Sequence, residues 1–135
     1  MTYIYQYFIA ILVFLGIDAI WLMFIAKSFY AKNIGHLLAE KPNLVAAFIF
    51  YLLNIIGLVI FAINPAIQKN SLINALIFGA LFGFFTYSTY DLTNLATLKD
   101  WPLIVSVIDI IWGTLLSATV SGLTYVILQS FLAKG

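Results

Sequence analysis

Four long apolar runs dominate this chain of 135 residues and restrict what it can fold into. They lie at about 4–26, 44–63, 73–98 and 102–128. Each reaches the roughly 20 residues that a helix needs to cross ~30 Å of hydrocarbon. Only 8% of the residues are charged, whereas a soluble domain carries about 25%. We therefore predict an all-α integral membrane protein in which residues 1–135 form one antiparallel four-helix transmembrane bundle.

Composition excludes several classes of function. The chain has no cysteine and a single histidine, His36. Thiol chemistry is therefore excluded, and a zinc site has too few of its usual ligands. A formal net charge of +1 gives no electrostatic basis for binding nucleic acid. We assign no residue as a metal ligand, and the sequence leaves any cofactor unknown.

Lysines flank the runs unevenly and predict an orientation. Four lie in the first and third connections and two on the opposite side, namely Lys27, Lys32, Lys41 and Lys99 against Lys69 and Lys134. Lysine is enriched in cytoplasmic loops, so we expect both termini on the periplasmic side of the membrane. The bias is small, and a small bias is also typical of proteins that insert in both orientations.

Local signals predict where the helices begin and end. Gly35 is suited to end the first helix and Pro42 to open the second. The Asn64-Pro65 step favours leaving the second helix. Ser71 is suited to cap the third helix, and Pro102 to open the fourth.

Small and polar residues recur along one face of the third and fourth runs. Gly79 and Gly83 form a Gly-x-x-x-Gly pair, which lets helices approach closely. The same face continues through Tyr87, Asp91 and Asn94. In the fourth run the matching face holds Ser106, Asp109, Gly113, Ser117 and Ser121. We expect the two faces to point into the bundle, with the Gly79/Gly83 face packed on a neighbouring span or on a second copy of the chain.

Three aspartates, Asp18, Asp91 and Asp109, interrupt the apolar runs. A carboxylate at bilayer depth costs several kcal/mol unless it is protonated, paired or hydrated. From a helical rise of about 1.5 Å per residue, each aspartate lies roughly 10–12 Å deep on the side of the first and third connections. Other polar and aromatic residues reach a similar level. The candidate ligand-binding residues are Asp18, Trp21, Tyr51, Asn54, Tyr87, Tyr90, Asp91, Asn94, Asp109 and Trp112.

No lysine lies at the level of these acids, and the chain has no arginine, so we expect some of the three to hold a proton at neutral pH. Asp91 has Tyr87 and Asn94 within one helical turn, so we predict it to be the better-solvated or better hydrogen-bonded acid and the one that carries the charge. Three interpretations stay open: a bound cation such as an organic amine or Mg²⁺, a proton relay, or acids that hydrogen-bond one another. A simple polar packing seam is the alternative to a site.

Several strings resemble one protein family. They are Tyr90–Leu98, Trp101–Leu103, Asp109–Gly113, Asp18–Leu22 and the Phe29-Tyr30 to Gly35-His36 stretch. The chain resembles, over essentially its whole length, the small bacterial membrane proteins grouped as domain of unknown function 2177. The resemblance implies a bacterial inner-membrane location and carries no activity.

The residues therefore support three functions. The first is a membrane protein whose acid-lined cavity binds a small or amphiphilic ligand, with an accessory or lipid-modifying role. The second is a proton-coupled small-molecule exporter acting as a homodimer, because size, span count and an intramembrane acid resemble small multidrug transporters. The third is a structural subunit of a membrane complex. Membrane lipid is the expected surrounding partner in all three, and whether the protein is an enzyme stays open.

Overall fold

The computed structural model describes the backbone of residues 2–134 and the side chains of residues 3–131. Over that part of the chain there are helices and no strands. Four helical stretches are long and apolar enough to cross a membrane: Tyr3–Leu37, Leu44–Lys69, Leu72–Thr97 and Leu103–Phe131. The prediction of an all-α four-span membrane protein is confirmed.

The first helical stretch continues past its apolar run and contains a widened turn. Helix α1 (Thr2–Trp21) passes into the π-helical turn η1 (Leu22–Ala26) and then into α2 (Lys27–Ile34). Gly35 ends α2, as predicted, and one 3-10 turn, η2 (Gly35–Leu37), follows. Because the helix does not stop at residue 26, its last turns extend past the apolar run and bring further polar side chains to the bundle.

The second stretch also contains a π-helical turn. It consists of α3 (Leu44–Leu58), η3 (Val59–Ile63) and α4 (Asn64–Lys69). Asn43, one residue after the predicted Pro42 start, caps α3 by accepting a hydrogen bond from the Ala46 amide, with an N–O distance of 3.1 Å.

The prediction that the helix ends at Asn64-Pro65 is wrong. The π turn η3 widens the backbone just before Pro65, and so accommodates a ring that would clash in a regular α-helix. The helix ends instead at Asn70, in the left-handed conformation with φ 51°. Asparagine tolerates that conformation. Ser71 then caps the next helix, as predicted, by accepting a hydrogen bond from the Asn74 amide.

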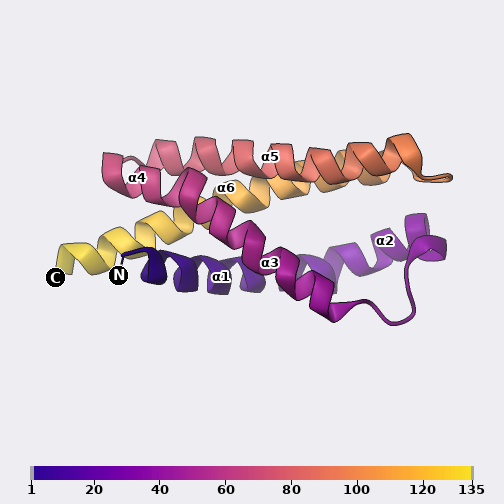
Figure 1. The fold of residues 1–135 in the computed structure, drawn as a ribbon, viewed down its shortest axis with the longest axis horizontal. Helices are drawn as coiled ribbons and strands as arrows, with labels where there is room; N and C mark the ends of the chain where they lie inside the picture. Colours follow the sequence, from indigo (N-terminus) through magenta and orange to yellow (C-terminus); the bar gives the residue numbers. More distant parts are fainter. Residues whose placement is uncertain (1, 135) are drawn as a thin grey trace.

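The third and fourth stretches, α5 (Leu72–Thr97) and α6 (Leu103–Lys134), pack side by side along most of their length (Figure 1). A Cβ atom added to Gly79 would lie 2.8 Å from the Ser117 carbonyl oxygen. One added to Gly83 would overlap the Gly113 carbonyl oxygen. The Gly79/Gly83 face therefore packs directly on α6, which confirms the close approach that the glycine spacing predicts.

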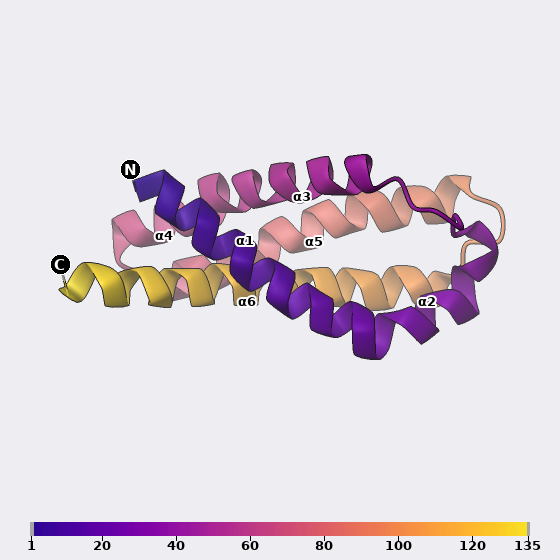
Figure 2. The ribbon, with the colours of Figure 1, turned by 90° about the horizontal axis from the view of Figure 1, so that it is seen from below.

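The two ends of the bundle differ. Both termini and the α4–α5 connection lie at one end, which we call the termini end (Figure 1). The α2–α3 connection and the α5–α6 turn lie together at the other, which we call the loop end (Figure 2). In Figure 2, α1 crosses α6 obliquely, and α3 lies along the edge of the bundle opposite α6. Pro102 precedes α6 at the loop end, as predicted.

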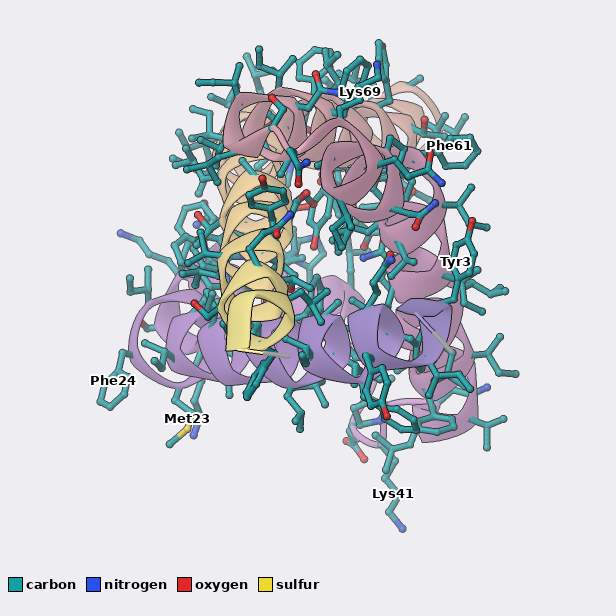
Figure 3. The ribbon with its side chains drawn as sticks, turned by 90° about the vertical axis from the view of Figure 1, so that its left-hand side faces the viewer. Tyr3, Met23, Phe24, Lys41, Phe61 and Lys69 are labelled. Carbon is teal, nitrogen blue, oxygen red and sulfur yellow. The ribbon has the colours of Figure 1, made fainter. Side chains whose placement is uncertain are left out.

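An apolar cluster lies at the centre of the bundle. Phe14 from α1, Leu58 from α3 and Leu116 from α6 are fully buried in one cluster with their neighbours. Large apolar side chains also cover the outside. Figure 3 shows Met23, Phe24 and Phe61 pointing away from the helices, and each of the three is well exposed. An apolar exterior around a packed centre is the arrangement expected of helices surrounded by lipid.

Candidate functional site

Asp91 is the most buried of the three acids. Its side chain, on the loop-end half of α5, is 0% exposed. Neither carboxylate oxygen accepts a hydrogen bond from any described residue. The expected donors, Tyr87 and Asn94, do not reach it, so the prediction that Asp91 is the better-solvated or better hydrogen-bonded acid is wrong. A buried carboxyl group without a donor is costly, and it therefore requires an explanation.

A hydrogen-bonded relay fixes the backbone around Asp91. The Trp101 indole N–H donates to Ser106 Oγ at 3.0 Å, and the Ser106 hydroxyl donates to the Asp91 carbonyl oxygen at 2.9 Å. Trp101 and Ser106 are both buried. The relay links the α5–α6 turn to α5. It thereby holds the backbone that carries the Asp91 carboxyl group.

Asp109 on α6, unlike Asp91, accepts a hydrogen bond. The Tyr30 hydroxyl, from α2, donates to Asp109 Oδ1 at 2.5 Å. Sequence reasoning missed Tyr30 because it lies beyond the first apolar run. The Phe29-Tyr30 pair in the continuing helix was the only signal that could have pointed to it.

The Asp91 and Asp109 carboxyl groups lie close enough to interact. They share the wall of a cavity of about 530 Å³ at the loop end, which we call the acid cavity. Its other walls are mostly apolar, and Lys27 is the one cation among its lining residues. The lining residues are Leu22, Ala26, Lys27, Tyr30, Ala31, Ile34, Leu38, Tyr90, Asp91, Trp101, Val105 and Asp109.

Asp18 lies outside that lining. It is buried on α1 and accepts a hydrogen bond from the Tyr51 hydroxyl of α3 at 3.3 Å. It also interacts electrostatically with Asp109. The Phe14 ring packs edge-on against Tyr51, with centroids 5.6 Å apart, so the apolar centre of the bundle begins directly beside this pair.

Two tryptophans join the helices that carry Asp18 and Asp109. Trp21 and Trp112 stack with ring centroids 4.2 Å apart and an interplanar angle of 8°. Each follows its aspartate by three residues, about one helical turn. The Trp112 indole N–H is buried and donates to no described residue. The repeated Asp-x-x-Trp strings thus bring both acids to the same stacked pair.

A second cavity of about 460 Å³ lies between α3 and α5, and we call it the α3–α5 cleft. It shares Tyr90 and Asp109 with the acid cavity. Tyr87 also lines it, and the Tyr87 ring occupies the space above Gly113 that a methyl group would need. The lining residues are Ala46, Ala47, Phe50, Thr86, Tyr87, Tyr90 and Asp109.

The two amide side chains of the predicted site lie outside both cavities. Asn54 is buried on α3, and its Nδ2 donates to no described residue. Asn94 is half-buried on α5. Neither lines the acid cavity or the α3–α5 cleft.

A separate polar cluster occupies the termini end. The Gln6 side-chain N–H donates to Asn64 Oδ1 at 2.9 Å, and the Asn64 amide donates to the Tyr3 hydroxyl at 2.9 Å. Gln6 is fully buried, and its Oε1 accepts from no side chain or backbone group in the described part of the chain. Sequence reasoning missed this cluster because it treated Asn64 as a helix end. The apolar centre around Phe14 and Leu116 lies between the two polar regions.

Among residues 3–131, no three His, Asp or Glu side chains are grouped so that they could hold a metal ion. The acids instead form one close pair, Asp91 with Asp109, and a neighbour, Asp18, that has its own hydroxyl donor. The arrangement offers hydrogen-bond acceptors to a donor-rich group of moderate size.

Comparison with known protein families adds an independent result. The model of the family described as "Predicted membrane protein (DUF2177)" matches residues 3–126. The chain belongs to this family. A search of curated proteins and a search of solved structures each found no significant match. Membership confirms the family resemblance of the sequence and the membrane character of the fold, and the family description names no activity.

Proposed function

We propose that this DUF2177 member binds a small amphiphilic ligand through an amine-bearing polar group in the acid cavity. The observation that carries the proposal is Asp91, fully buried beside Asp109 with two oxygens that have no donor. An ammonium group has three N–H donors and a positive charge. It would supply donors to the two Asp91 oxygens, which accept from no described residue, and a positive charge to the pair of acids.

The walls of the cavity favour an amphiphile over a fully polar ligand. Leu22, Ala26, Ile34 and Val105 surround the acids. Ligand sites are commonly apolar, with a few converging polar groups that fix orientation. An alkyl segment against these walls and an amine against the acids would satisfy both parts of the cavity.

Lys27 is the alternative counter-ion for the acids. It lines the same cavity, but its side chain is exposed, and an exposed flexible lysine forms weak ion pairs. A bound ammonium would compete with it. Replacing Lys27 by glutamine should therefore strengthen amine binding.

The dimeric exporter and the structural subunit are less well supported as proposals. An exporter that moves protons across the bilayer needs a polar path between its two ends, and the apolar cluster around Phe14, Leu58 and Leu116 separates the acids from the Gln6–Asn64 cluster. A subunit that uses its polar stripe for a partner helix would expose it, whereas Gly79 and Gly83 are covered by α6 of the same chain.

We further propose a bacterial inner-membrane location with the loop end in the cytoplasm. Lys27, Lys32, Lys41 and Lys99 belong to that end, and cytoplasmic loops are rich in lysine. The chain has no cysteine, so single-cysteine variants give a clean test. A membrane-impermeant maleimide should label Lys69→Cys on intact cells and Lys41→Cys only after permeabilisation. The reverse pattern would contradict the orientation.

Binding can be tested by tryptophan fluorescence. Trp101 lines the acid cavity, while Trp21 and Trp112 form the stack beside it, so all three tryptophans of the chain report on this region. The protein in lipid nanodiscs is titrated with decylamine, 1-decanol and decanoate. We expect a saturable change with decylamine alone.

Variants identify the residues responsible. Asp91→Asn and Asp109→Asn should each weaken decylamine binding by about tenfold or more, since a hydrogen bond to a charged group is worth roughly 1.5–3 kcal/mol. Asp100→Asn is the matched control, because Asp100 is an exposed acid in the α5–α6 turn. Equal responses to the three amphiphiles, or wild-type affinity in both site variants, would overturn the proposal.

A further inference from the structure

The α3–α5 cleft leads to the same acid as the acid cavity, from a different side of α5. Asp109 and Tyr90 lie in the walls of both cavities. A group bound at Asp109 therefore sits where the two cavities meet. A ligand with a polar head and a tail could place its head there and extend its tail into the cleft.

The cleft has the form of a slot for an apolar chain. Its α3 wall begins with two small side chains, Ala46 and Ala47, followed by Phe50. The α5 wall supplies Thr86, whose hydroxyl is already used, donating to the Phe82 carbonyl oxygen at 2.9 Å. Ala46, Ala47 and the paired Thr86 hydroxyl therefore present no unpaired polar group to a passing chain, and the rings of Tyr87 and Tyr90 complete the α5 wall.

The outer edges of the cleft face the surroundings of the bundle. Phe48 and Ile49 on α3 and Phe85 on α5 are exposed apolar residues next to its lining. In a four-span membrane protein such a surface is in contact with acyl chains. A molecule in the cleft is therefore reached from the lipid, whereas Lys27 and Leu38 place the acid cavity near the loop end.

We infer that the α3–α5 cleft is a lateral opening through which a bilayer-resident amphiphile with a primary ammonium head reaches Asp109 and Asp91. The inference rests on the proposed function and adds the source and the shape of the ligand. Charge complementarity selects the head, because Asp91 offers two buried oxygens with no donor. A primary ammonium can donate to them, whereas a trimethylammonium head has no N–H to donate. The carbons next to the head lie against the apolar walls of the acid cavity, and the rest of the alkyl chain occupies the cleft.

The test blocks the cleft without changing the acids. Ala47, in the cleft wall, is replaced by cysteine in the otherwise cysteine-free chain. One folded preparation is then divided and modified with either a methyl or a benzyl thiosulfonate. Ala96→Cys is the matched control, because Ala96 is an exposed residue of α5 outside both cavities. Comparing the two reagents on one preparation separates blockage from misfolding.

Two amines distinguish the route from the site. Decylamine and butylamine carry the same head, but only the longer chain needs the cleft. The benzyl group at position 47 should weaken decylamine binding by at least about tenfold, equivalent to about two methylene groups lost from an apolar environment. Butylamine binding should stay unchanged, and so should both amines on Ala96→Cys.

The outcomes separate the two levels of proposal. If decylamine binding depends on Asp91 but not on the benzyl group, the lateral opening is refuted and the ligand enters from the loop end. If a decyltrimethylammonium salt binds as tightly as decylamine, the N–H donor argument is refuted. If decylamine binds Asp91→Asn and Asp109→Asn as tightly as the wild type, the proposed function is refuted, whatever the result for the cleft.

Discussion

Gly83 gives the most quantitative prediction about the fold. A Cβ atom at this position would overlap the Gly113 carbonyl oxygen and would lie 2.5 Å from Ser117 Oγ and 2.7 Å from Ser117 Cβ. Side-chain atoms can rotate away, but a backbone oxygen moves only if α6 moves. Gly83→Ala must therefore push α5 and α6 apart where they are most closely packed.

The matched control is Gly16→Ala on α1, where an added Cβ atom would meet nothing within 4 Å. Both substitutions gain about 1 kcal/mol of helix propensity, so that contribution cancels in the comparison. What remains is the cost of overpacking, typically 1–3 kcal/mol. Gly83→Ala should therefore be less stable than Gly16→Ala by about 1–3 kcal/mol.

The free energy of unfolding can be measured by titrating sodium dodecyl sulfate into mixed micelles and following helical circular dichroism. The difference between the two variants is the quantity of interest. If the two variants differ by less than about 0.5 kcal/mol, a typical error when independent mutational effects are combined, the close α5–α6 contact at Gly83 is refuted.

Three further predictions follow from single contacts. Tyr30→Phe removes the hydroxyl donor to Asp109 and should destabilise the fold by about 1–3 kcal/mol in the same unfolding assay, while Tyr5→Phe, at an exposed ring, should have no effect. Ser71→Ala removes the cap of α5 and should cost about 1 kcal/mol; a cost near zero would show that the cap is dispensable. Decylamine affinity should rise with pH, because the acids must ionise to pair with an ammonium group. The rise should reach about tenfold per pH unit if binding releases one proton. Binding titrations at several pH values measure it, and a fall in affinity would contradict the prediction.

Helical spacing and depth allowed much of the fold and part of the site to be predicted. The number of spans follows from run lengths alone, and the Gly79/Gly83 contact follows from a four-residue spacing that leaves one ridge without side chains. Counting residues from the helix ends also brought Asp91 and Asp109 to one region, because a helix has a fixed rise.

What the sequence could not supply depends on tertiary packing. Tyr30 reaches Asp109 only because the first helix continues through the π turn η1, and hydropathy does not register such a turn. The π turn η3 likewise keeps the helix intact through Pro65, where local preferences predict an end. Tyr87 and Asn94 lie within one turn of Asp91, but helical spacing alone does not show whether their side chains donate to it. That depends on rotamers and on the rotation of the helix, so the prediction for these two donors failed.

The central claim is that the Asp91–Asp109 pair is the binding group of an amine. Two neighbouring buried carboxyl groups cannot both ionise without a counter-ion, so without a bound cation one of them should carry a proton. A bound ammonium would supply the counter-charge, and that proton would leave to solvent. Infrared difference spectroscopy on adding decylamine measures this exchange directly. We predict loss of a protonated carboxyl band and gain of carboxylate bands in the wild-type protein, with neither change in Asp91→Asn. An unchanged carboxyl region in the wild type, or the same difference spectrum in the variant, would contradict the claim.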